Sequence, residues 1–139
     1  MSVDFFIDTN VLIYAYDSAD EEKHQIARKI LTDVWDARIG AAISVQVLQE
    51  FYHVMSRRGD QRYYRKRAED MLNWLVIENT TGLFKQALKV HQEFRTSFYD
   101  ANIIAAAQVS GAKEVWSEDF NTGQDYGGVV AVNPFENDE

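Results

Sequence analysis

The chain opens with an apolar segment, a short polar step and a second apolar segment. Residues 5–7 are apolar and are typical of a buried strand. Asp8 follows them directly, and Thr9 and Asn10 are favourable N-cap residues for a helix that begins with the apolar residues 11–14. In an open α/β sheet the carboxyl ends of the strands line the ligand crevice, so this pattern places Asp8 where binding sites usually form.

Short apolar stretches and amphipathic stretches alternate along the rest of the chain. This alternation predicts an α/β fold with a parallel sheet, and the length of 139 residues fits a single domain over 1–139. The hydrophobic spacing predicts helices over residues 21–38, 45–57, 61–75 and 82–95 and a small-residue interior helix from residue 101, with strands over residues 41–43, 75–77, 114–116 and 129–132.

Three further acids stand in positions that relate to that of Asp8. Glu50 lies on the flank of the apolar stripe of its helix, and Asp100 stands in the first turn of the small-residue helix. Asp119 follows the strand 114–116 as Asp8 follows the first strand. If the strands are parallel, all four carboxylates can point into one crevice.

Each acid also has a simpler interpretation when it is taken alone. Asp8 can be a plain helix cap, Glu50 a half-exposed residue at the edge of the core, and Asp100 a favourable charge at a helix N-terminus. The four together are harder to explain, because two like charges about 4 Å apart repel by roughly 4 kcal/mol at an effective dielectric constant near 20. Such a cluster must take up protons or bind a cation.

The residue types indicate which cation and which chemistry. The chain has no cysteine, which excludes disulfides, thiolate metal sites and cysteine catalysis, and its three histidines are not paired at ligand spacing. Oxygen-only ligands favour Mg²⁺ or Mn²⁺ over Zn²⁺. A carboxylate-held ion of this kind typically works on phosphates, so the acids point to phosphodiester hydrolysis.

Composition and charge modify this interpretation. A hydrophobic fraction of 46% favours a globular fold, and the lack of a membrane-length apolar run or a signal-peptide pattern leads us to expect a cytoplasmic protein with no membrane partner. The formal net charge of −8 argues against nucleic-acid partners, although a bound metal would neutralise part of it. Positive charge is concentrated in residues 57–67, where Arg62, Arg65 and Arg67 form either a plain solvated helix face or an RNA-backbone clamp beside two tyrosines.

Four segments that carry these acids together resemble the PIN-domain ribonucleases, especially the VapC-type toxins of prokaryotic toxin–antitoxin pairs. The segments are VDFFIDTNVLIYAY, ISVQVLQEFYHV, SFYDANIIAAA and VWSEDFNTG, and they are distributed along residues 3–123 in the family's order. The resemblance implies a three-layer α/β/α fold with a short central parallel sheet. It also implies a Mg²⁺- or Mn²⁺-dependent endoribonuclease that is typically a homodimer and is neutralised by a small antitoxin protein.

Carried over residue by residue, the resemblance makes Asp8, Glu50, Asp100 and Asp119 the catalytic, metal-site acids. Asn10 and Ser117 resemble supporting polar groups, and Glu118 is an extra acid that could replace Asp119 as a ligand. A non-catalytic binding or scaffold module of the same fold is the main alternative. A receiver-type phosphate-handling domain fits less well, because it would need adjacent acids after the first strand and a late lysine. The RNA target, the antitoxin and the number of metal ions do not follow from the sequence.

Overall fold

The structure is a computed structural model that describes residues 3–136. Each of its helices starts at a residue whose side chain caps the helix N-terminus. A side chain accepts a backbone N–H bond at the N-terminus of each helix, as N-caps do, and these side chains are those of Asp8, Asp20, Ser44, Asp60, Thr80 and Ser97. The elements are β1 (Phe5–Ile7), α1 (Thr9–Tyr16), α2 (Glu21–Trp35), β2 (Ala41–Ser44), α3 (Val45–Arg58), α4 (Gln61–Met71), β3 (Leu75–Ile77), α5 (Thr81–Phe94), α6 (Phe98–Ser110), β4 (Glu114–Trp116) and β5 (Val130–Val132).

The strands form one sheet in the order β3-β2-β1-β4-β5, and every neighbouring pair is parallel. The chain therefore leaves the central strand β1 in one direction through β2 and β3, and returns to its other side through β4 and β5. This reversal is a topological switch point, and its crevice lies beyond the carboxyl ends of β1 and β4. Asp8 and Ser117 are the first residues after those two strands.

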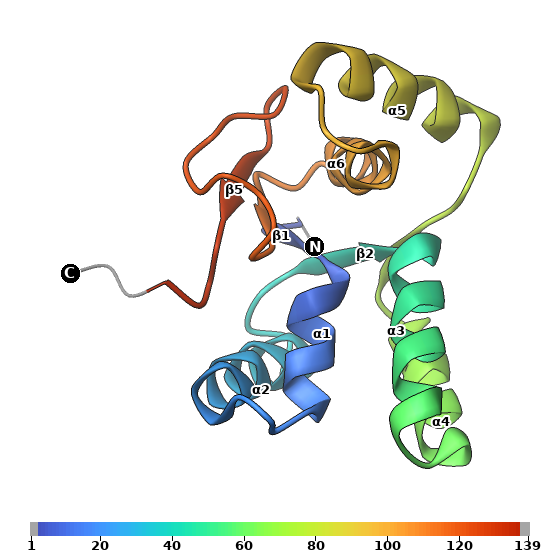
Figure 1. Ribbon diagram of the computed structural model, residues 1–139, viewed down its shortest axis with the longest axis vertical. Coiled ribbons are helices and arrows are strands. Elements are labelled where there is room, and N and C mark those ends of the chain that lie inside the picture. Colours follow the sequence, from blue (N-terminus) through green and yellow to red (C-terminus); the bar gives the residue numbers. More distant parts are fainter. Residues whose placement is uncertain (1–2, 137–139) are drawn as a thin grey trace.

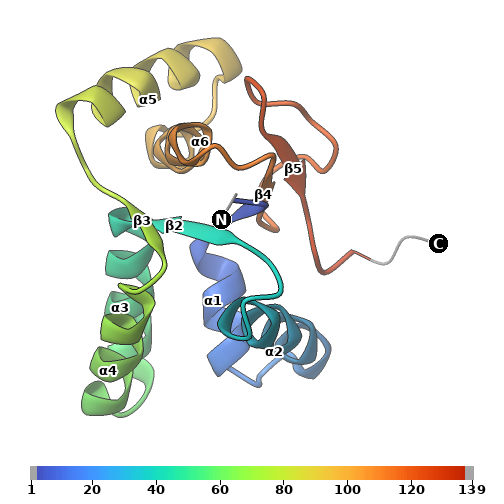
Figure 2. The ribbon, with the colours of Figure 1, turned by 180° about the vertical axis from the view of Figure 1, so that it is seen from behind.

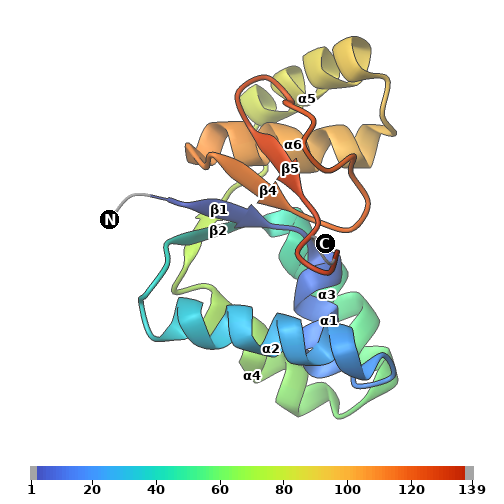
Figure 3. The same cartoon turned by 90° about the vertical axis from the view of Figure 1, so that its left-hand side faces the viewer.

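Helices cover both faces of the sheet, so the expected three-layer α/β/α fold is confirmed. Helices α5 and α6 lie on one face and α1 to α4 lie on the other (Figure 1), and the side view in Figure 3 shows the sheet between the two layers. Seen from behind in Figure 2, β3 lies beside β2 at one edge of the sheet. Within the described part of the chain, none of the helices combines the length and the apolar character that a membrane span requires.

The core gathers on both sides of β1, whose three residues are all buried. On one side, Leu12 and Phe51 are fully buried beneath the sheet. On the other side, α6 packs against the strands with a run of buried small residues, Ala105 to Ala107. Small side chains let this helix approach the sheet closely. Its first turn lies at the same end of the sheet as Asp8, because Asp100 and Asp8 line the same cavity.

Two helices end three or more residues before the predicted position. The helix predicted to reach residue 38 ends at Trp35, because Ala37 adopts a positive φ of 57° that an α-helix does not continue through. The helix predicted to reach Leu75 ends at Met71, and Leu75 belongs to β3 alone. Neither difference moves one of the candidate site residues.

Candidate active site

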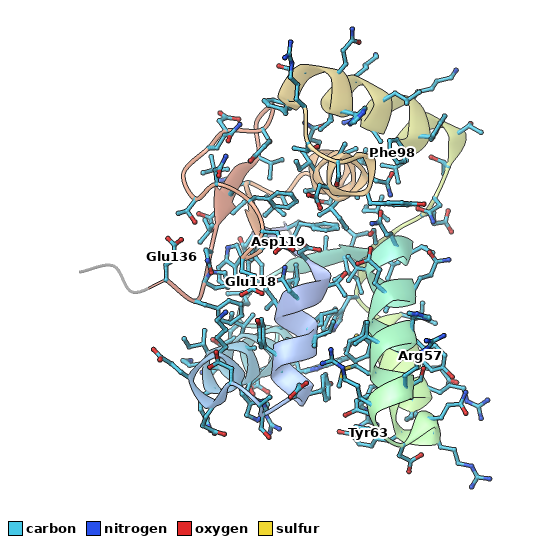
Figure 4. All side chains as sticks on the ribbon, viewed as in Figure 1. Arg57, Tyr63, Phe98, Glu118, Asp119 and Glu136 are labelled. Atoms are coloured by element: carbon cyan, nitrogen blue, oxygen red, sulfur yellow. The ribbon has the colours of Figure 1, made fainter. Side chains whose placement is uncertain are left out.

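Four acids that are far apart in the sequence line a single cavity of about 310 Å³. The first stands at the end of β1, the second on α3, the third in the first turn of α6 and the fourth in the loop that follows β4. Figure 4 shows Asp119 and its neighbour Glu118 beside the N-terminal end of α1. The acids of this cavity, which we call the acid pocket, are Asp8, Glu50, Asp100 and Asp119.

Asp8 is the most deeply placed of these acids, with a relative exposure of 5%. Its Oδ1 accepts a hydrogen bond of 2.7 Å from the backbone N–H of Thr9, and its Oδ2 accepts one of 2.8 Å from the hydroxyl of Ser117. Burial raises the pKa of Asp8 to about 7, and the charges of Asp119 and Glu50 add to that rise, while the two hydrogen bonds oppose it. Asp8 is therefore both the N-cap of α1 and a carboxyl group that takes up protons readily.

Ser117 and Asn10 connect the acids of the two central strands. The buried Ser117 hydroxyl donates to Asp8 and accepts bonds from the Asn10 side chain at 3.2 Å and from the Asp119 backbone N–H at 3.1 Å. The Asn10 amide also donates to Asp119 Oδ2 at 3.0 Å. These bonds set the distance between Asp8 and Asp119 and the direction of the Asp119 carboxylate.

Glu50 and Asp100 approach the acid pocket from the two helix layers. Both carboxylate oxygens of Glu50 accept hydrogen bonds, one of 3.2 Å from the Thr9 hydroxyl and one of 2.7 Å from the side-chain amide of Gln46. Burial raises the pKa of Asp100, the Asp119 and Glu50 charges add to the rise, and hydrogen bonding to the Ser97 side chain opposes it. The prediction that Asp100 stands in the first turn of its helix is confirmed.

Glu118 lies apart from the four acids. Its Oε2 forms an ion pair of 2.8 Å with Lys23, and its Oε1 accepts a bond of 2.9 Å from the Tyr14 hydroxyl. It lines a second cavity of about 460 Å³, which shares Asn10 and Ile13 with the acid pocket. The structure therefore gives Glu118 a cationic partner of its own.

The three arginines considered for RNA binding lie on α4, and none of them lines the acid pocket. Arg62 and Arg65 are exposed. Arg67 is partly covered: its guanidinium lies 4.9 Å from the centre of the Tyr63 ring and 3.1 Å from an oxygen of Asp70. In Figure 4, Tyr63 lies at the far end of the α3–α4 pair from Asp119.

Sequence reasoning did not assign Gln46 and Asn102 to the site, and it took Thr9, whose hydroxyl donates to Glu50, only as a helix cap. Gln46 is buried and precedes Glu50 by four residues, a spacing that brings helical side chains together and that could have identified it. Asn102 donates to the Gln46 side chain from α6. No spacing in the sequence relates Asn102 to Gln46.

The donor set suits a hard divalent cation. The acids supply only oxygen atoms, which Mg²⁺ and Mn²⁺ prefer, and the raised pKa of Asp8 shows that its buried charge is disfavoured without a counter-charge. Over residues 3–136, however, no three acidic or histidine side chains stand close enough together to hold an ion as they are placed. The chemistry of the acid pocket fits a metal, and the acids have to draw together to bind one.

Comparisons with known proteins identify the family to which the chain belongs. The PIN domain family model matches residues 5–123. Ribonuclease VapC7 of Mycobacterium tuberculosis (strain ATCC 25618 / H37Rv) is 38% identical over 55 residues, which are 40% of this chain and 37% of that protein's length. The match to this relative thus spans well under half of either protein.

Solved structures share the fold at low sequence identity. VapC20 of Mycobacterium tuberculosis, a Sarcin-Ricin loop cleaving toxin, is similar with a TM-score of 0.65 and 24% identity over 84% of this chain and 92% of its own. A toxin–antitoxin complex from Klebsiella pneumoniae is similar with a TM-score of 0.70 and 22% identity, over 96% of this chain and 99% of the matched chain. VapBC2 from Rickettsia felis, bound to a DNA fragment from its promoter, is similar with a TM-score of 0.66 and 14% identity, over 94% of this chain and 98% of the matched chain.

Proposed function

Because the chain belongs to the PIN-domain family, we propose that it is a metal-dependent endoribonuclease that hydrolyses RNA phosphodiester bonds as the toxin of a type II toxin–antitoxin pair. The observation that carries the proposal is the acid pocket, where four carboxylates from four separate segments of the chain line one cavity at the switch point of the sheet. A structural role alone does not explain why mutually repelling acids gather there.

In this proposal Asp8, Glu50, Asp100 and Asp119 hold Mg²⁺ or Mn²⁺. When bound, such an ion makes a hydroxide-like nucleophile available at neutral pH and neutralises charge on the displaced phosphate oxygen. Ser117 holds Asp8 through its hydroxyl, and Asn10 holds Asp119 through its amide. These two residues orient the acids.

The biological setting is part of the same proposal. The similarity to a VapC ribonuclease and the shared fold with toxin–antitoxin complexes support a small antitoxin partner. The proposal also keeps the homodimer that the sequence resemblance implies. We propose a cytoplasmic location, where the protein would meet an RNA substrate, and we treat residues 1–139 as one domain because the family model spans most of them. Arg62 and Arg65 are exposed and available to an RNA backbone.

One observation favours a second candidate, a non-catalytic PIN-fold binding or scaffold module. The acids of the described residues do not form a closed metal cluster. A module of this kind would bind its partner without needing a metal. Its acid pocket would respond to neither Mg²⁺ nor Mn²⁺.

Cleavage of a total-RNA pool by the purified protein separates the two candidates. The reaction is run with Mg²⁺, with Mn²⁺ and with EDTA, beside Asp8→Asn and the surface control Asp36→Asn, which makes the same change of charge at an exposed position. We expect metal-dependent cutting that Asp8→Asn abolishes and Asp36→Asn retains. A protein that neither cuts RNA nor gains thermal stability from either metal is the non-catalytic module.

A further inference from the structure

Two side-chain amides stand behind Glu50. Gln46 is 7% exposed and donates to Glu50 Oε1 at 2.7 Å, and Asn102 donates to the Gln46 side-chain oxygen at 2.5 Å. We propose that Gln46 and Asn102 are positioning residues that fix the direction of the Glu50 carboxylate and the spacing of α3 and α6 across the acid pocket. This inference rests on the proposed function, because it assigns both residues to the nuclease site.

The neighbours of Gln46 allow its amide only one orientation. An ionised carboxylate and a backbone carbonyl can only accept hydrogen bonds, so the side of the amide that faces Glu50 and the Tyr99 carbonyl must carry the NH₂ group. The Gln46 oxygen then faces Asn102, which must present its own NH₂ group. Turning the Gln46 amide over would place oxygen against two acceptors and nitrogen against a donor.

The same bonds join the two helix layers that carry acids. Gln46 lies in the first turn of α3, one turn before Glu50, whereas Tyr99 and Asn102 flank Asp100 on α6. A buried amide that contacts both helices therefore relates the position of Glu50 to that of Asp100. Residues that orient metal ligands in this way typically change metal affinity or activity by about 10- to 100-fold when they are replaced.

Asn102→Asp tests the orientation and not merely the packing. Asp has nearly the shape of Asn, but its ionised side chain cannot donate to Gln46, so the Gln46 amide must turn over or face an acceptor. Asn102→Leu removes the donor without adding an acceptor. Gln49→Glu controls for the added negative charge, because Gln49 is exposed and adjoins Glu50 in sequence. The double variant Gln46→Met with Asn102→Asp removes the amide that would otherwise turn over.

The measurements are the Mn²⁺ concentration that gives half of the full rise in melting temperature, and kcat/KM on RNA at saturating Mn²⁺. We expect Asn102→Asp to weaken Mn²⁺ binding by about 10- to 100-fold, more than Asn102→Leu does, while Gln49→Glu changes it little. In the Gln46→Met background, Asn102→Asp should have no further effect. Equal effects of Asn102→Asp and Asn102→Leu, or an Asn102→Asp effect that persists without Gln46, would overturn the proposal.

The side-chain NH₂ resonances of Gln46 give a readout that needs neither metal nor activity. In the wild type they should be shifted and protected from exchange by the two acceptors, and in Asn102→Asp they should move while those of exposed Gln49 do not. Gln46 signals that resemble those of a solvent-exposed glutamine in the wild type contradict the inference. A wild type that ignores Mn²⁺ and leaves RNA intact overturns the proposed function instead, whatever the Gln46 signals show.

Discussion

Replacing Asp8 by Asn should change how the stability of the metal-free protein depends on pH. The pKa of Asp8 lies at about 7 in the folded chain, against 3.8 for an unperturbed Asp. The folded state therefore holds a proton that the unfolded state has already released between these two pH values. The contribution of this proton to the free energy of unfolding is fully present below about pH 4, and it is lost as the pH rises to and through 7.

The size of the effect follows from the pKa difference. One pKa unit corresponds to about 1.4 kcal/mol, so the free energy of unfolding of the wild type should fall by about 2 to 3 kcal/mol between pH 5 and pH 8 because of Asp8 alone. Asn cannot ionise, so this component disappears in Asp8→Asn. The variant also loses one hydrogen bond at Thr9 or Ser117, which lowers its stability by about 1 to 3 kcal/mol at every pH and leaves the slope unaffected.

Urea unfolding in EDTA, measured at several values of pH from 5 to 8, gives both slopes. The informative quantity is the difference between the wild type and Asp8→Asn, because every other ionisable group is present in both proteins. Asp36→Asn serves as the control and should follow the wild type. Parallel stability curves for the wild type and Asp8→Asn would refute the claim that Asp8 is a buried carboxyl group under repulsion from its neighbours.

Further perturbations test the remaining parts of the site. Saturating Mn²⁺ should raise the melting temperature of the wild type, and Asp100→Asn should raise that of the metal-free protein by removing one repelling charge; no response in either experiment contradicts a shared acid pocket. Ser117→Ala removes the hydrogen-bond donor to Asp8, so it should lower kcat/KM on RNA by about 10- to 100-fold and raise the pKa of Asp8, measured by NMR, above its wild-type value. An unchanged pKa of Asp8 would show that the hydroxyl does not hold this carboxyl group. Replacing Arg62, Arg65 and Arg67 by Ala should weaken RNA binding in a filter assay without unfolding the chain, and unchanged affinity and oligomeric state would leave them as plain surface.

The sequence allowed the main features of the fold to be predicted because they depend on local patterns. Strand β1 and the helix that follows it can be recognised from a few neighbouring residues, although the cap of α1 is Asp8 and the predicted caps Thr9 and Asn10 lie inside the helix. The gathering of Asp8 and Asp119 needed only the added assumption of parallel strands, which places both at one edge of the sheet. The end of α2 could not be predicted, because the conformation of Ala37 depends on the route of the chain to β2.

Contacts between distant segments account for what sequence reasoning did not find. Asn102 and Gln46 are 56 positions apart, and they meet only because α3 and α6 lie against the same end of the sheet. The same is true of Glu118 and Lys23, whose pairing separates Glu118 from the acids beside which it stands in the sequence. Residue type indicates what such side chains can do, but their partners depend on how whole elements pack.

The strand order also sets the moment at which the site is complete during synthesis. Asp8 and its partner Ser117 are separated by 109 positions, and β4 must reach β1 before their bond can form. Domains generally fold as units while the chain emerges, so a chain that ends before residue 114 leaves one side of β1 without a neighbouring strand and lacks Ser117 and Asp119. A chain that has not reached β4 therefore cannot assemble the acid pocket, and the ribosome that makes the protein is not exposed to the completed site until residues 117–119 have been added.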